Sequence, residues 1–136
     1  MDWITETIAI GNYLDAQDAE LLRREAIGSV LGLTRALEGV EAAALGVQGI
    51  RMVPLADGPG NDLRTFRLAL AALAELLASA PPVLVHCHAG RSRAAVVVAG
   101  HLIATRGLAP DEALALIAAK REIAVSPALE RLLDHL

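Results

Sequence analysis

The 136-residue sequence has one cysteine, one tryptophan, one tyrosine, one phenylalanine and no long hydrophobic run. A single cysteine cannot form an internal disulfide, which suits a protein of a reducing compartment. The longest apolar segment, residues 94–103, is interrupted by Gly100 and His101 and is too short to cross a bilayer. Few aromatic side chains and a net charge of −4 disfavour a nucleic-acid-binding surface.

Hydrophobic residues nevertheless make up 54% of the chain and charged residues 21%, as in folded globular proteins. The length predicts one domain over residues 1–136. The chain starts MDWITE, with acidic residues where a secretory signal has a basic region. We therefore expect a cytoplasmic protein with no membrane span and no nucleic-acid partner.

Short apolar segments alternate with helical patterns along the chain. The predicted strands are residues 4–10, 27–33, 50–55 and 82–85. A short helix is predicted to begin after a cap at Asp15 or Asp18 and to end at residue 24. The other predicted helices are residues 36–45, 63–78, 93–106, 110–120 and 128–136. Strands that alternate with helices predict an α/β fold with a central, mostly parallel sheet flanked by helices.

The most informative stretch is HCHAGRSR, residues 86–93, which we call the signature loop. It lies between the apolar strand at 82–85 and the helix that follows, so it predicts a tight turn into a helix N-terminus. Backbone N–H groups, the helix dipole and the Arg93 guanidinium would together bind an anion such as phosphate. The same field favours the thiolate of Cys87, so the loop is predicted to bind a phosphoryl group and attack it.

Two simpler interpretations of this stretch are less well supported. Cys87 could only fill the core, as free cysteines often do. A core position does not need Gly90, Ser92 and two arginines in one turn before a helix. Three consecutive potential ligands, residues 86–88, also make a poor metal site because neighbouring strand residues point to opposite faces. We therefore predict no metal and no cofactor.

The pattern His-Cys-x5-Arg resembles the signature of the cysteine-dependent protein tyrosine phosphatases, and the chain's size resembles their compact dual-specificity branch. The similarity extends to residues 8–11, 21–22 and 27–34, which match the family's strand, helix, strand entry, and to Ser126-Pro127 before the last helix. It implies a tyrosine-phosphatase-like fold and a metal-independent phosphatase. Such an enzyme hydrolyses phosphotyrosine, and also phosphoserine or phosphothreonine, of a protein or a small phosphomonoester through a cysteinyl-phosphate.

The resemblance also assigns roles within the signature loop. Cys87 would be the nucleophile, and Arg93 would grip two phosphate oxygens and stabilise charge in the transition state. His86 would orient the loop and support the thiolate. The phosphate-binding residues would be His88, Ala89, Gly90, Arg91, Ser92 and Arg93, and the Ser92 hydroxyl would brace the loop.

The family's general acid is an aspartate on a mobile loop about thirty residues before the cysteine, after a strand that ends near a proline. Asp57, which follows Pro54 and precedes Gly58 and Gly60, matches that placement. Asp62 is the rival, but its position before a helix already explains it as a cap. Arg121, near the end of the 110–120 helix, is expected to complement that helix's C-terminal dipole.

One residue departs from the family pattern. Ala94 stands where the family has a serine or threonine that stabilises the departing cysteine. This keeps open a phosphate-binding recognition module that turns nothing over. Basic residues at His88 and Arg91 keep open a phosphoinositide or other polyanionic substrate. A rhodanese-like sulfurtransferase also has a cysteine loop after a strand, but its loops resemble Cys-x4-Arg and have no use for Asp57.

Overall fold

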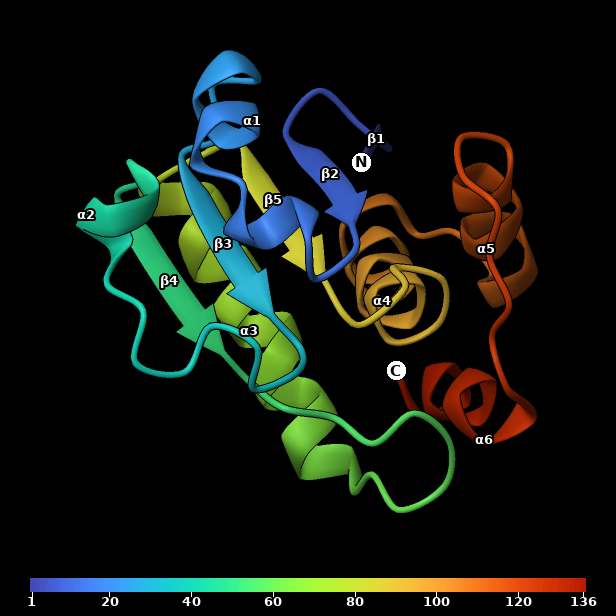
Figure 1. The fold of residues 1–136 in the computed structure, drawn as a ribbon. Coiled ribbons are helices and arrows are strands. Elements are labelled where there is room, and N and C mark those ends of the chain that lie inside the picture. Colours follow the sequence, from blue (N-terminus) through green and yellow to red (C-terminus); the bar gives the residue numbers. More distant parts are fainter.

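A five-stranded sheet forms the centre of the molecule (Figure 1), and the computed structural model describes all residues from 1 to 136. The strands are β1 (Asp2–Trp3), β2 (Ile8–Gly11), β3 (Ser29–Gly32), β4 (Gly49–Met52) and β5 (Val83–His86). Their order in the sheet is β1-β2-β5-β3-β4, and only β1 pairs antiparallel with its neighbour. This topology confirms the predicted α/β fold with a mostly parallel sheet.

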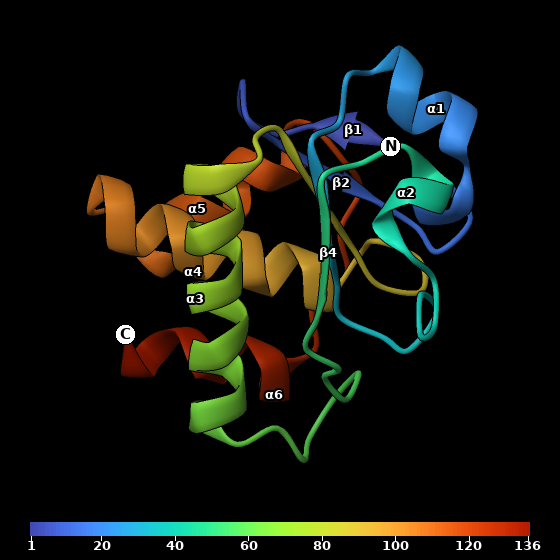
Figure 2. The same ribbon diagram turned by 90° about the vertical axis from the view of Figure 1, so that its left-hand side faces the viewer.

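Helices cover both faces of the sheet. The helices are α1 (Ala19–Arg24), α2 (Ala42–Leu45), α3 (Leu63–Ser79), α4 (Arg93–Arg106), α5 (Pro110–Ala118) and α6 (Pro127–Glu130), with 3₁₀ turns at η1 (Asp15–Gln17) and η2 (Arg131–His135). Figure 2 shows α1 and α2 on one side of the sheet and the other four helices on the opposite side. None of the helices is both long enough and apolar enough to span a membrane.

The strand before the signature loop and the helix after it form the most buried part of the fold. All four residues of β5 are buried between β2 and β3. On α4, every residue from Ala94 to Gly100 is buried, so the helix is covered on all sides rather than along one stripe. Because both ends of the signature loop are fixed in the core, the loop backbone has little freedom to move.

The predicted helix over residues 36–45 is wrong for most of its length, because only Ala42–Leu45 is helical. Gly39 has φ of +77°, which breaks an α-helix before Val40. The strand predicted at 50–55 is also shorter, as β4 ends at Met52. The final helix divides into α6 and the 3₁₀ turn η2.

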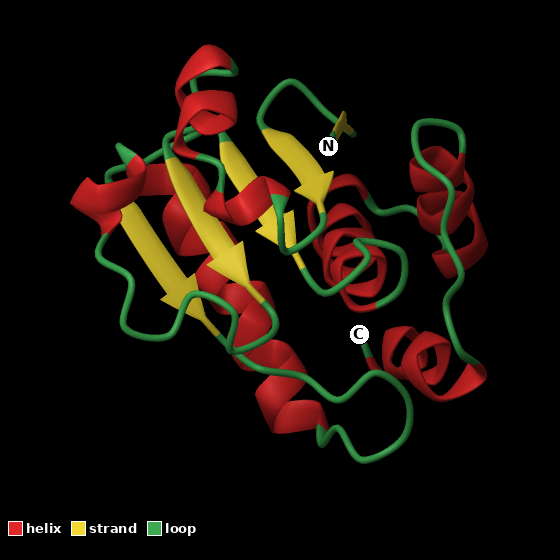
Figure 3. Cartoon of the chain, viewed as in Figure 1, coloured by secondary structure: helices red, strands yellow, loops and turns green.

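The structure identifies the residues that cap α1 and α3. Asp18, rather than Asp15, caps α1, since its carboxylate accepts a hydrogen bond from the Leu21 N–H at 3.0 Å. Asp62 caps α3 through the Thr65 N–H at 2.7 Å. Figure 3 shows that the carboxyl ends of the parallel strands continue into loops, which is where ligands bind in open α/β sheets.

Candidate active site

The signature loop joins β5 directly to α4, as the sequence predicted. His86 is the last residue of β5 and lies between Gly11 of β2 and Gly32 of β3. Cys87 follows with 1% of its surface exposed, and Arg93 is the first residue of α4. The cysteine therefore lies at the carboxyl end of the central strand, beside the positive end of a buried helix.

The carbonyl groups of residues 88–92 are each bound by a group that lies outside the loop. Their five bonds are Tyr13 N to His88 O (3.1 Å), Arg121 Nη2 to Ala89 O (3.1 Å), Arg121 Nε to Gly90 O (2.7 Å), Ala124 N to Arg91 O (2.9 Å) and Val96 N to Ser92 O (2.9 Å). In a trans peptide, the C=O and the following N–H point in opposite directions. The N–H groups of residues 89–93 are therefore turned away from these partners. The N–H groups of residues 88–92 donate to no protein acceptor, so they are available to an anion.

Gly90 is required by this arrangement. Its φ of +69° lies in the left-handed region, which side chains other than glycine rarely adopt. A Cβ at this position would overlap the carbonyl oxygen of Gly11 at the end of β2. The absence of a side chain thus lets the signature loop lie directly against the neighbouring strand.

The Arg93 guanidinium is held beside the loop and keeps a free donor. Its Nη1 donates to the Leu55 carbonyl at 3.3 Å, which fixes the side chain against the segment after β4. Its Nε is buried and has no partner. A buried N–H group without an acceptor costs about 1–3 kcal/mol, and a bound oxyanion would remove that penalty. Arg93 therefore has an N–H donor free for a second partner, which can be an anion.

Asp57 reaches the signature loop through Ser92. The Ser92 hydroxyl donates to Asp57 Oδ1 at 2.5 Å, so the two predicted site residues are brought together. The loop that carries Asp57 is closed by Asn61, whose side-chain oxygen accepts from Ala56 N and whose nitrogen donates to Ala56 O, both at 2.7 Å. These two hydrogen bonds hold Asp57 against the signature loop, in a segment that is neither helix nor strand.

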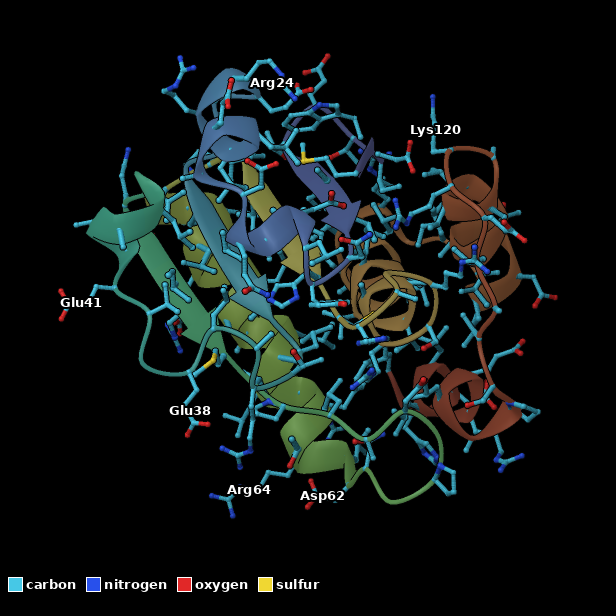
Figure 4. All side chains as sticks on the ribbon, viewed as in Figure 1. Arg24, Glu38, Glu41, Asp62, Arg64 and Lys120 are labelled. Atoms are coloured by element: carbon cyan, nitrogen blue, oxygen red, sulfur yellow. The ribbon has the colours of Figure 1, made fainter.

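Asp62, the rival for the general-acid role, is held elsewhere. The hydrogen bond from the Thr65 backbone keeps the pKa of Asp62 below its usual value, with smaller contributions from the Thr65 side chain and Arg64. Figure 4 shows Asp62 at the start of α3, pointing away from the body of the molecule. The structure thus separates the two aspartates: one caps a helix, and the other contacts the signature loop.

His86 is a buried, neutral imidazole behind the cysteine. Burial is the main cause that lowers the pKa of His86 below its ordinary 6.5, and the charge of Arg93 lowers it further, against the opposing effect of the Cys87 carbonyl. Its Nδ1 donates to that carbonyl at 3.3 Å, which supports the predicted orienting role. No three or more His, Cys, Asp or Glu side chains lie together in a group that could hold a metal ion.

The lowered pKa of His86 predicts a loss of stability in mild acid. The folded protein binds fewer protons at His86 than the unfolded chain, so its contribution is present above about pH 6.5 and is lost as the pH falls from there through the folded-state pKa. In His86→Asn, whose amide can still donate to the Cys87 carbonyl, the free energy of unfolding should fall less steeply over this range. Urea unfolding at a series of pH values measures the slope.

The exposed His135 supplies the control for this measurement, because His135→Asn makes the same replacement at the surface and leaves the buried His86 in place. His101, whose pKa is also lowered mainly by burial, is present in every variant and cancels in the comparison. Parallel curves for the wild type and His86→Asn would contradict the prediction.

Two residues of the site escaped the sequence analysis. The Tyr13 ring stacks on His88 with centroids 4.7 Å apart and planes 8° apart. Arg121 was expected to complement the dipole of its helix, which is wrong: α5 ends at Ala118, and the guanidinium binds carbonyls of the signature loop. Neither residue belongs to a local motif. Tyr13 follows the turn Gly11-Asn12, which is the one signal that placed it beyond the end of a strand.

Comparison with known proteins identifies the family. The family model described as "Dual specificity phosphatase, catalytic domain" matches residues 8–134. Dual specificity phosphatase 28 of Mus musculus is 33% identical over 122 residues, which cover 89% of this chain and 73% of the relative. Dual specificity protein phosphatase 22 of Mus musculus is 29% identical over 127 residues, covering 91% of this chain and 66% of the relative, so this chain spans about two thirds of it.

Solved structures agree with this result. A crystal structure of a mouse putative dual specificity phosphatase complexed with zinc tungstate has a TM-score of 0.85 at 27% identity, covering 98% of this chain and 84% of that one. Human DUSP28 also gives 0.85, over 99% of this chain and 94% of that one, and at 24% identity it supports the fold alone. With the family model matched from β2 almost to the C-terminus, this chain belongs to the dual specificity phosphatase catalytic domains of the cysteine-dependent tyrosine phosphatase superfamily, the enzyme class that the signature loop predicted.

Proposed function

We propose that the protein hydrolyses phosphate monoesters through a cysteinyl-phosphate formed on Cys87. The observation that carries this proposal is the arrangement of residues 88–92 in the signature loop: their carbonyls are bound by groups outside the loop, while their N–H groups have no protein acceptor. With the free Nε of Arg93, these donors suit the equatorial oxygens of a phosphoryl group. Cys87 lies at the base of that arrangement.

In the first step, the Cys87 thiolate attacks phosphorus, an S–P bond forms and the bond to the ester oxygen breaks. Asp57 donates a proton to that oxygen, so the leaving group departs as a neutral alcohol or phenol. In the second step, water attacks phosphorus, Asp57 takes a proton from the water, and the S–P bond breaks to return the thiolate. Arg93 holds two non-bridging oxygens through both steps.

The rim of the site supports one substrate class as the first to test. The exposed His88 ring stacks on Tyr13 and gives the entrance a flat aromatic side, which suits the ring of an aryl phosphate. We therefore assign phosphotyrosine as the first substrate to test, in a protein or as a small phosphomonoester, followed by phosphoserine and phosphothreonine. The test is phosphate release from an aryl phosphate in the presence of a chelator, beside Cys87→Ser.

Ala94 predicts that the second step is slow. It is fully buried in the first turn of α4 and offers no hydroxyl to the departing Cys87 sulfur. Phosphoenzyme should therefore form faster than it is hydrolysed, and rapid mixing with an aryl phosphate should give a burst approaching one phenol per enzyme molecule. The Ala94→Ser variant should show a smaller burst and a faster steady state.

Ala99, equally buried further along α4, provides the matched control. Ala99→Ser introduces the same hydroxyl into the same helix away from Cys87, so it should keep the wild-type burst. A linear time course for the wild-type enzyme, with no burst, would contradict the prediction.

A further inference from the structure

Arg121 lies between α5 and α6 and takes no part in the steps above, yet it binds the signature loop directly. Its Nε donates to Gly90 O at 2.7 Å and its Nη2 donates to Ala89 O at 3.1 Å. Only 13% of the side chain is exposed. One guanidinium thus holds two consecutive carbonyls of the loop with its planar fork.

A third contact fixes the orientation of this guanidinium. Arg121 Nη1 donates to Asp2 Oδ2 at 2.8 Å, and Asp2 belongs to β1, which pairs with β2. Strand β2 ends at Gly11, and the Gly11 carbonyl oxygen and Arg121 Nη2 both lie where a side chain of residue 90 would point. Gly90 is therefore packed directly against both the end of β2 and Arg121.

These contacts determine where two N–H groups of the loop point. The carbonyls of Ala89 and Gly90 face Arg121, so the N–H groups of Gly90 and Arg91 face the opposite way. Gly90 lacks a side chain, and without a partner its flanking peptides could rotate and direct a carbonyl oxygen toward the bound anion. Such a rotation would replace an attractive donor by a repulsive acceptor.

We propose that Arg121 is a positioning residue of the phosphatase reaction, which fixes the N–H groups of Gly90 and Arg91 for the phosphoryl oxygens and is itself oriented by Asp2. This inference rests on the proposed function, because it concerns the same loop. This positioning role differs from a purely stabilising one. The ion pair between Arg121 and the partly exposed Asp2 adds little to the free energy of unfolding. The two loop contacts, by contrast, act on donors that serve the transition state.

The test compares Arg121→Ala and Arg121→Lys with the wild type on an aryl phosphate. Removal of the guanidinium should lower kcat/KM about 100-fold, as when an oxyanion donor is lost. The lysine variant keeps the charge but cannot bind both carbonyls, so it should lose about 10-fold. Inorganic phosphate should inhibit both variants more weakly than the wild type, because the same N–H groups bind the product.

Chemical rescue separates positioning from stability. A cavity of about 210 Å³ lined by Asp2, Arg91, Arg121 and Glu122 opens beside the guanidinium, so free guanidinium can enter when the side chain is removed. Added guanidinium, at concentrations that leave the wild type folded, should restore part of the activity of Arg121→Ala. Arg24→Ala is the matched control: Arg24 is exposed on α1 and points away from the molecule (Figure 4), so this variant should keep wild-type activity and show no rescue.

Each outcome has one meaning. If the wild type and Arg24→Ala are active while Arg121→Ala equals them in kcat/KM and phosphate inhibition, the positioning role is wrong and the proposed function stands. The role is also wrong if Arg121→Ala loses activity only in proportion to its unfolded fraction, measured by thermal unfolding, and guanidinium restores none of it. If the wild type itself releases no phosphate but binds it, the proposed function fails. Weaker phosphate binding by Arg121→Ala would then still support Arg121 as the residue that orders the loop.

Discussion

Replacement of Cys87 by serine is expected to abolish phosphate release from an aryl phosphate, by about 10⁴-fold or more. A serine hydroxyl is not ionised near neutral pH, so it is a far weaker nucleophile than the thiolate. The N–H groups of the loop and Arg93 are unchanged by this substitution. The variant should therefore still bind inorganic phosphate or tungstate, which titration calorimetry measures.

Because Cys87 is the only cysteine, alkylation gives an independent measure of the same group. Iodoacetate should inactivate the wild type with one carboxymethyl group incorporated, and inorganic phosphate should protect against it, since both compete for the signature loop. Activity should persist with a chelator present. Phosphate release by Cys87→Ser at the wild-type rate would overturn the cysteinyl-phosphate mechanism.

Substitution of Asp57 by asparagine is expected to lower kcat/KM, which reports phosphoenzyme formation, by about 10²–10⁴-fold on a substrate with a poor leaving group, the range of general acid catalysis. Asparagine keeps the shape and can still accept the hydrogen bond from Ser92, but it cannot donate the proton. The loss should be smaller on an activated aryl phosphate, whose phenolate leaves without protonation. Steady-state kinetics on a pair of such substrates measures this difference.

Asp62→Asn is the matched control for Asp57→Asn, because both make the same replacement in the segment between β4 and α3. Asparagine caps helices as well as aspartate does, so α3 should keep its N-terminus and activity should stay at the wild-type level. A large loss in Asp62→Asn with a small one in Asp57→Asn would reverse the assignment of the general acid.

Some of the structural features behind these predictions follow from local sequence patterns, and others do not. The signature loop could be predicted because strand, turn and helix start lie within one short stretch, and their signals are local: a buried run, a glycine and a buried helix. The mostly parallel sheet followed from the same kind of pattern, repeated along the chain. The prediction of a helix over residues 36–45 was wrong because Gly39 adopts a left-handed conformation, which the periodicity of apolar residues does not reveal.

The contacts between distant segments could not be foreseen. Ser92 and Asp57 are 35 residues apart, and Arg121 is 31 residues from Gly90 and 119 from Asp2. The bond to Ser92 is what distinguishes Asp57 from Asp62 in the structure, and it exists only because β4 and β5 both lie beside β3.

The sequence by itself therefore determined which chemical groups lie together in one segment of an α/β sheet: a cysteine, a glycine-containing turn and an arginine. The tertiary structure decided how that segment is held. Local patterns specify backbone conformation and burial, whereas the partners of the loop carbonyls depend on the strand order β1-β2-β5-β3-β4 and on the return of residues 121–124 past the loop. Tyr13 and Arg121 became part of the site only through that long-range packing.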